Sequence, residues 1–201
     1  MPVCVECNKG VQDVERGARC SGCSLPLCSK ECAAGGRHLL ECQEFRRRGW
    51  RAGDDVDRIG ALMEALTAIR MILNKKALKS EDREEFIKDL FDLSQGNGDI
   101  PEIDEKVVNE AVNIFGEDLD REEFRTCYNQ LFINGKSLGE GFPPGSGLYL
   151  VFSIMNHSCM ANTSVVINSD TEIQVQYKLY PNMQASHFTA DPLHLVTVLS
   201  K

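Results

Sequence analysis

The stretch LCSKECAAGGRHLLEC, residues 27–42, holds three cysteines and one histidine at short intervals. Two more cysteine pairs precede it, so seven of the nine cysteines lie within the first 42 residues. Thiolates and imidazole nitrogens are preferred zinc ligands, and a spacing of two or three residues lets both members of a pair face one ion. The sequence therefore predicts two tetrahedral zinc sites built from four ligand pairs: Cys4 and Cys7, Cys20 and Cys23, Cys28 and Cys32, and His38 and Cys42.

A disulfide framework is the alternative interpretation of so many cysteines. The paired spacing and the single histidine favour metal, and the N-terminal MPVCVEC lacks the basic and apolar stretches of a secretory signal. We therefore expect a reducing compartment, with a cytoplasmic and nuclear location. Residues 1–51 carry a net charge of +3, which offsets the −3 that two Zn²⁺ ions and seven thiolates bring together.

The remaining charge is acidic and unevenly distributed. The whole chain has a net charge of −8, of which residues 52–131 carry −10 and residues 132–201 carry −1. This balance argues against direct nucleic-acid binding, and no apolar run reaches the roughly 18 residues of a membrane span. The basic stretch FRRRGWR, residues 45–51, is interpreted as a solvated linker or, alternatively, as a local patch that contacts nucleic acid or an acidic partner.

Residues 54–131 are expected to form helices, because apolar residues recur there at helical spacing. Asp120 and Glu123 resemble a capping box for the last of them, and Cys127 falls in its apolar stripe as a core residue. The predicted helices occupy residues 59–73, 80–96, 104–116 and 120–131.

The last third of the chain changes in character after Asn134. The string GEGFPPGSG, residues 139–147, is expected to be a loop. The strings SVVIN (164–168) and EIQVQY (172–177) predict a β-hairpin around a polar turn. The fold class expected from these elements is α+β.

The ligand order and the 27–42 string resemble the MYND zinc finger. The string NHSCMAN, residues 156–162, resembles the NHSCxPN signature of SET-domain lysine methyltransferases that carry a MYND finger, the SMYD family. The resemblance spans about residues 4–42 and 120–178. It implies a MYND-type double-zinc module over residues 1–50, an α-helical insert over 51–120, an incomplete β-rich SET portion with the NHSC motif over 121–180, and a tail of unknown structure over 181–201.

In that family the ligand pairs interleave, first with third and second with fourth. The resemblance therefore implies one zinc ion held by Cys4, Cys7, Cys28 and Cys32, and a second held by Cys20, Cys23, His38 and Cys42. It also implies that Asn156 and His157 line an S-adenosylmethionine site. The string NQLFI, residues 129–133, looks like a family strand that would add Asn129 to this cofactor site. Cys159 lacks the later cysteines of the family's third zinc site and is expected to be a partly buried thiol.

The function implied is methyl transfer from S-adenosylmethionine to a lysine of a protein substrate of the histone type. We expect weak or no activity, because the family's Gly-x-Gly segment before the finger and its tyrosine-bearing segment after the hairpin have no counterpart here. The sequence assigns no catalytic residue. The alternative is an adaptor in transcriptional regulation whose MYND finger binds proline-containing peptides. In either case we expect zinc chelation to melt residues 1–50 and leave the helices largely intact.

Overall fold

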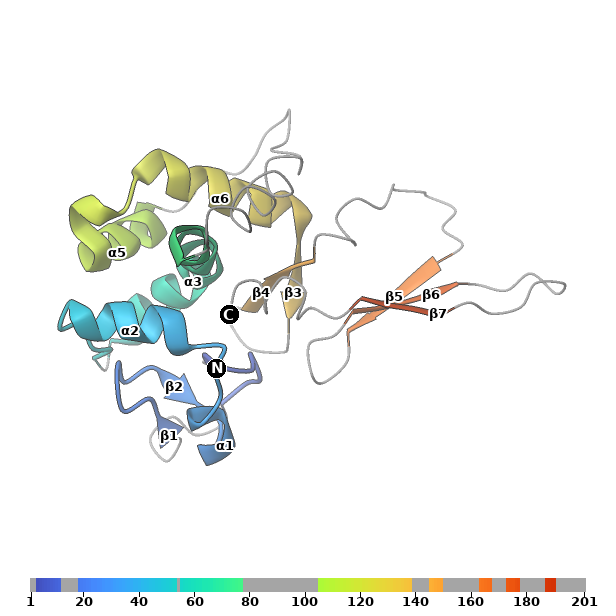
Figure 1. Cartoon of the computed structure of the whole chain (residues 1–201), viewed down its shortest axis with the longest axis horizontal. Coiled ribbons are helices and arrows are strands. Elements are labelled where there is room, and N and C mark those ends of the chain that lie inside the picture. The colour runs from blue at the N-terminus through green and yellow to red at the C-terminus, as the bar shows by residue number, and fades with distance from the viewer. Residues whose placement is uncertain are drawn as a thin grey trace, which may run out of the picture.

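The structure is a computed structural model and describes residues 3–11, 18–53, 55–77, 105–138, 145–149, 163–167, 173–177 and 187–190. These residues form helices and small antiparallel sheets, which confirms the α+β class. We call residues 3–11 and 18–53 the cysteine-rich segment; Figure 1 shows the helices that follow it gathered above it, with a three-stranded sheet to one side. Within the described ranges, every helix is too short or too polar to cross a membrane.

The cysteine-rich segment is built from very short elements. Strand β1 (Ala18–Arg19) pairs antiparallel with β2 (Pro26–Leu27), and helices α1 (Lys30–Ala33) and α2 (Leu39–Arg47) follow. Ser29 caps α1, since its Oγ accepts a hydrogen bond from the Cys32 backbone N–H at 3.2 Å. Strands of two residues and a helix of one turn are not stable alone in water. The segment therefore needs another source of stability.

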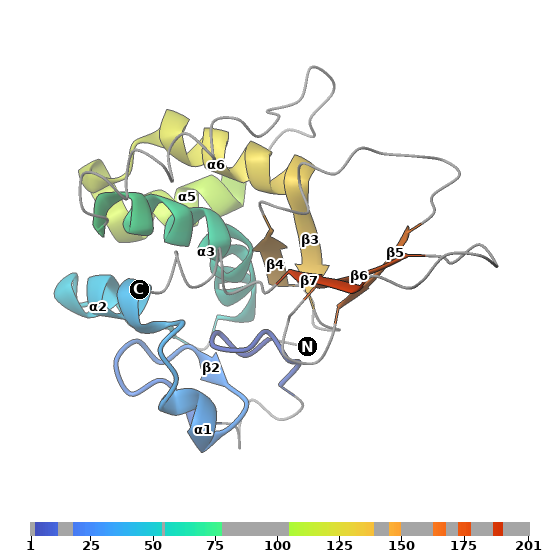
Figure 2. The ribbon, with the colours of Figure 1, turned by 45° about the vertical axis from the view of Figure 1, so that its right-hand side comes forward.

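Helix α3 (Val56–Ala77) is the central element of the helical part. It packs against α2, against α5 (Glu105–Phe115) and against α6 (Arg121–Asn134), and Figure 2 shows it between them. A single 3-10 turn, η1 (Gly116–Asp118), joins α5 to α6. Three of the four predicted helices are thus confirmed, and the one predicted over 80–96 lies outside the described residues.

Two local signals end and begin these helices as predicted. Gly116 ends α5 with a backbone φ of 58°, which glycine adopts without strain. Asp120 caps α6, because its Oδ1 accepts hydrogen bonds from the backbone N–H groups of Glu122 and Glu123 at 2.8 and 2.9 Å. The Glu123 half of the predicted capping box is not the contact the structure shows: the Glu123 carboxylate accepts a hydrogen bond from Lys75, which ties α6 to α3.

One hydrophobic core runs through the cysteine-rich segment and the helices. It contains fully buried side chains from both parts, among them Leu25, Phe45, Leu62, Ile69 and Phe124. Cys127 is 3% exposed and belongs to this core, as predicted.

The linker interpretation of FRRRGWR is wrong. Phe45 is buried in α2, and its ring lies 5.9 Å from that of Phe115. Arg48 donates hydrogen bonds to the Phe115 carbonyl oxygen at 2.8 Å and to the Asp118 carboxylate at 2.6 Å. Its guanidinium also lies over the Phe115 ring, 5.0 Å from the centroid. Side chains of this stretch therefore pack the end of α2 against the end of α5.

The predicted strand at residues 129–133 is also wrong, because these residues continue α6. Phe124, Cys127 and Leu131 are all buried, so the apolar face keeps helical spacing through the motif. The predicted loop over 139–147 is partly a strand: β4 (Gly145–Leu148) pairs antiparallel with β3 (Gly135–Leu138).

The predicted hairpin is confirmed as β5 (Thr163–Ile167) paired antiparallel with β6 (Ile173–Tyr177). A further strand, β7 (His187–Ala190), pairs antiparallel with β6. It lies within residues 181–201, for which the sequence predicts no structure. The resulting sheet has the order β5-β6-β7.

Candidate metal centres

Eight side chains of the cysteine-rich segment converge into two groups of four. Within each group, the potential ligand atoms all lie within 4.8 Å of one another. We call them the Cys4 group and the His38 group; their members are Cys4, Cys7, Cys28 and Cys32, and Cys20, Cys23, His38 and Cys42. The ligand pairs thus interleave along the chain, as the resemblance implied.

The distances within the groups suit a tetrahedral ion. In the Cys4 group the Sγ atoms of Cys7 and Cys32 each lie 3.5 Å from that of Cys28. In the His38 group the Sγ atoms of Cys20 and Cys42 are also 3.5 Å apart. A tetrahedron of thiolates around zinc has edges of about 3.8 Å, because each Zn–S bond is about 2.3 Å long. The donor atoms therefore already have close to the spacing that zinc requires.

Two turns with the same backbone geometry present the first pair of each group. The Cys4 N–H donates to the Lys9 carbonyl and the Asn8 N–H donates to the Cys4 carbonyl, both at 2.8 Å. The second turn repeats this pattern, with Cys20 donating to Leu25 at 2.9 Å and Ser24 donating to Cys20 at 2.8 Å.

A left-handed residue reverses the chain directly after the second cysteine of each turn. Asn8 has a φ of 61° and Ser24 has a φ of 66°. Asparagine adopts this conformation more readily than most residues. The reversal lets both thiols of a pair point toward the same ion.

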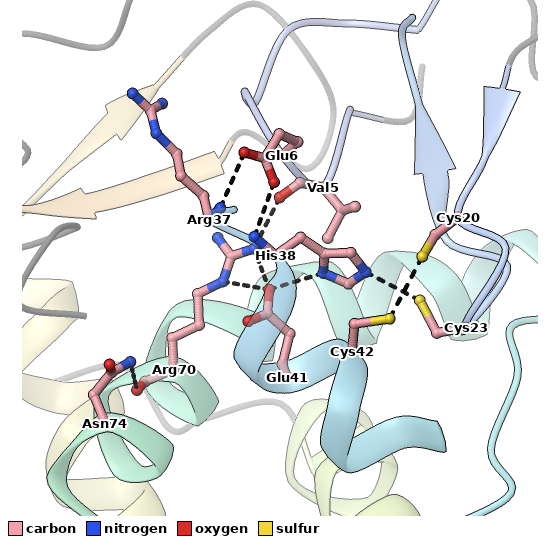
Figure 3. Close-up of polar contacts among 10 residues, drawn as sticks. All are labelled: Val5, Glu6, Cys20, Cys23, Arg37, His38, Glu41, Cys42, Arg70 and Asn74. Carbon is pink, nitrogen blue, oxygen red and sulfur yellow. Dashed lines mark hydrogen bonds and ion pairs between the residues drawn. The ribbon is translucent and has the colours of Figure 1, made fainter. Parts of the chain in front are cut away.

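His38 is held by a buried carboxylate. Its Nδ1 lies 2.9 Å from Glu41 Oε1, and an ionised carboxylate can only accept, so Nδ1 carries the proton. The other ring nitrogen, Nε2, is then free to bind a metal, and it lies 3.1 Å from Cys23 Sγ. Figure 3 shows the ring held between Glu41 on one side and the cysteines on the other.

Arginines surround the second turn. Arg51 donates to the carbonyl oxygen of Ser21 at 3.1 Å and to Ser24 Oγ at 2.8 Å, and Arg19 donates to the Ser24 carbonyl at 3.2 Å. Three thiolates, a neutral histidine and Zn²⁺ sum to a charge of −1, which these cations offset.

Their surroundings give the thiols of the His38 group divergent pKa values. Burial raises the pKa of Cys42 to about 11 and moves that of Cys23 well above its usual range. Burial also acts to raise the pKa of Cys20, but hydrogen bonds from the Cys23 and Gly22 backbone N–H groups outweigh it and lower that pKa to about 7. Zinc binds thiolates, so metal uptake must release protons from the buried thiols.

The two groups differ in exposure. Cys28 is exposed and Cys32 is half-buried, whereas Cys23, His38 and Cys42 are buried. The Cys4 group therefore has one side open to solvent.

The other predicted site residues are not part of these groups. Asn156, His157 and Cys159 lie outside the described residues. Asn129 lies on α6, and its Oδ1 is buried without a hydrogen-bond partner in the described part of the chain.

Sequence reasoning missed Glu41, Glu6 and Arg70, which support the metal ligands through hydrogen bonds. The one available signal was the spacing of His38 and Glu41, three residues apart at the start of a helix.

Comparisons of the chain with protein-family models, with curated proteins and with solved structures found no match. The resemblance to the SMYD family stays a prediction from the motifs.

Proposed function

We propose that the chain is a zinc-binding protein in which two structural ions hold residues 3–11 and 18–52 in their fold. The observation that carries this proposal is the convergence of eight ligand atoms into two groups of four. Four protein donors complete a tetrahedral shell and leave no position for water or substrate, which is the pattern of a structural site. Zinc would also supply the stability that the short strands and helices of this segment lack.

Native mass spectrometry of the purified chain tests this proposal. Wild-type protein should carry two zinc ions. Cys28→Ser and Cys23→Ser should each carry one tightly bound ion, because each substitution removes a thiolate from a different group. Cys127→Ser is the matched control and should keep two, since this thiol lies in the helical core. A wild-type protein with fewer than two ions would refute the proposal.

A second proposed function is binding of S-adenosylmethionine, with weak or no methyl transfer to lysine. The motif resemblance to the SMYD family suggests it, and the buried Oδ1 of Asn129 supports it. A buried amide oxygen costs free energy unless it accepts a hydrogen bond. An amino or hydroxyl group of the cofactor would be a suitable donor.

Isothermal titration with S-adenosylmethionine tests this second function. We expect saturable binding to the wild-type chain and weaker binding to Asn129→Ala. Asn134→Ala, on the same helix, is the control, since the Asn134 amide donates to the Gln130 carbonyl at 2.8 Å. Absence of binding to the wild-type chain would exclude the cofactor and leave the zinc proposal unaffected.

A further inference from the structure

A chain of buried polar groups connects the metal ligands to helix α3. It runs from His38 through Glu41 on α2 to Arg70 on α3, as Figure 3 shows. Glu41 is fully buried, and Arg70 has only 12% of its side chain exposed. Buried charged groups are rare unless each is paired, so this arrangement marks a constrained part of the molecule.

Glu41 sets the orientation of the His38 ring. Its Oε1 accepts the Nδ1 proton at 2.9 Å, which directs Nε2 to the cysteines of its group. A carboxylate on the far nitrogen of a ligating histidine fixes the tautomer and raises the basicity of the metal-binding nitrogen. Glu41 therefore supports the candidate ligand His38 from the side of the ring opposite the cysteines.

Arg70 holds Glu41 in this position. Its Nε donates to Glu41 Oε1 at 2.7 Å, and its Nη2 donates both to the same oxygen and to the Val5 carbonyl at 2.8 Å. Without Arg70, a fully buried carboxylate would lose its counter-charge and the hydrogen bonds that fix its orientation. A rotated carboxylate would no longer be a well-placed acceptor for His38.

The Val5 contact extends the chain to the Cys4 group. Val5 lies between Cys4 and Cys7. The Arg70 guanidinium therefore contacts both the Glu41 carboxylate, which holds His38, and the backbone of the turn that carries Cys4 and Cys7. Glu6, in the same turn, accepts hydrogen bonds from the backbone N–H groups of Arg37 and His38 at 3.0 and 2.9 Å. The first turn thus fixes the backbone that carries the histidine of the other group.

We infer that Arg70, which lies on helix α3 outside the cysteine-rich segment, is a positioning residue for metal binding in the His38 group. It acts through Glu41 on the His38 ring and makes metal affinity depend on the docking of α3 against α2. This inference rests on the proposed function, since it requires that the His38 group binds zinc.

The test compares Arg70→Met with the control Arg58→Met in the full chain. Arg58 lies on the same helix and pairs instead with Glu110 on α5 at 2.9 Å. Zinc affinities would be measured by competition with a chromophoric chelator. We expect Arg70→Met to retain two ions but to hold the one in the His38 group about 10- to 100-fold more weakly. Arg58→Met should match wild type.

Two further readouts separate positioning from general destabilisation. In the zinc-loaded wild type, long-range ¹H–¹⁵N NMR spectra should show His38 with Nδ1 protonated, and Arg70→Met should broaden or shift this ring signal while the other histidines stay unchanged. Arg70→Lys keeps a cation beside Glu41 and should recover most of the lost affinity.

The outcomes are distinguishable. If wild type binds fewer than two ions, the proposed function fails. If wild type binds two ions and Arg70→Met has the same two affinities, the inference fails while zinc binding stands. Should Arg70→Met not fold, Glu41→Gln carries the same comparison: weaker binding in the His38 group alone supports the inference, and unchanged affinity overturns it.

Discussion

Gly22 lies between Cys20 and Cys23 and has no room for a side chain. A Cβ atom there would lie 2.6 Å from Cys42 Sγ and 2.8 Å from Arg46 Cδ. The arginine can move aside, but the Cys42 sulfur would be fixed in place if it held a zinc ion as proposed. We predict that Gly22→Ala weakens zinc binding in the His38 group by roughly tenfold or more, as for other changes beside a metal ligand.

Chelator competition would measure this effect. Gly36→Ala is the control, because a Cβ at Gly36 meets nothing within 4 Å. Equal zinc affinities for the two variants would contradict the steric argument.

The thiols of Cys28 and Cys127 should differ strongly in reactivity. Cys28 is exposed, whereas Cys127 is buried among the helices, where burial and the negative charge of Glu123 raise its pKa to about 12. At pH 8 only on the order of 10⁻⁴ of such a thiol is thiolate, the form that reacts. We predict that limited alkylation of the zinc-loaded protein modifies Cys28 well before Cys127.

Peptide mapping by mass spectrometry would follow the order of alkylation. Protein denatured in guanidinium is the reference, since both thiols are then accessible. Labelling of Cys127 in the folded protein at its denatured rate would show that the core does not protect it.

Individual residues differ in how readily sequence reveals them. The eight candidate ligands that converge in the structure were predictable, because a metal ion needs donors in close pairs and this spacing is visible in the chain. Arg70 was not, since it lies 29 residues from Glu41 and only the packing of two helices brings them together.

At the scale of single elements, the Asp120 side chain caps the start of α6, and the stability that this cap contributes can be measured. Its side chain accepts two backbone hydrogen bonds that would otherwise be unmade. We predict that Asp120→Ala lowers the free energy of unfolding by about 1 kcal/mol. Urea denaturation with zinc present would measure it, and Arg121→Ala at the neighbouring exposed position should change stability little. Equal stabilities of the two variants would contradict this capping role.

Helices were predicted well because their signals are local. Periodic apolar residues, the Asp120 cap and Gly116 decide α3, α5 and α6 without reference to the rest of the fold. The motif resemblance at 129–133 predicts a strand, but the apolar residues there keep the helical spacing of α6, and this spacing decides the structure. Strand β4 was missed because it is rich in glycine, yet its pairing with β3 uses backbone groups that glycine also carries.

At the scale of the molecule, the shared core changes the expected effect of removing metal. From sequence alone we expected the helices to survive chelation. Side chains of the cysteine-rich segment and of the helices pack in one cluster, and Arg70 pairs with Glu41 across the junction. The structure therefore predicts that chelation lowers both the helical circular dichroism signal and the melting temperature of the cysteine-rich segment together with α3, α5 and α6. Added zinc should restore both.

Hydrogen exchange would localise the change. Faster exchange in α3 after chelation is the expected result. An unchanged α3 beside a protease-sensitive cysteine-rich segment would instead support two independent units. This packing could not be predicted, because sequence periodicity shows that a helix has an apolar face but not which surface covers it.

The interleaved order of the ligand pairs has a consequence while the chain is being synthesised. Cys4, Cys7, Cys20 and Cys23 leave the ribosome first, and four thiols suffice to bind an ion before their native partners exist. The native groups need Cys32 and Cys42, so an ion bound too early by the first two pairs must exchange one pair of thiolates for native partners before folding can finish. Abundant free zinc should therefore slow the maturation of new chains, whereas a buffered supply should speed it.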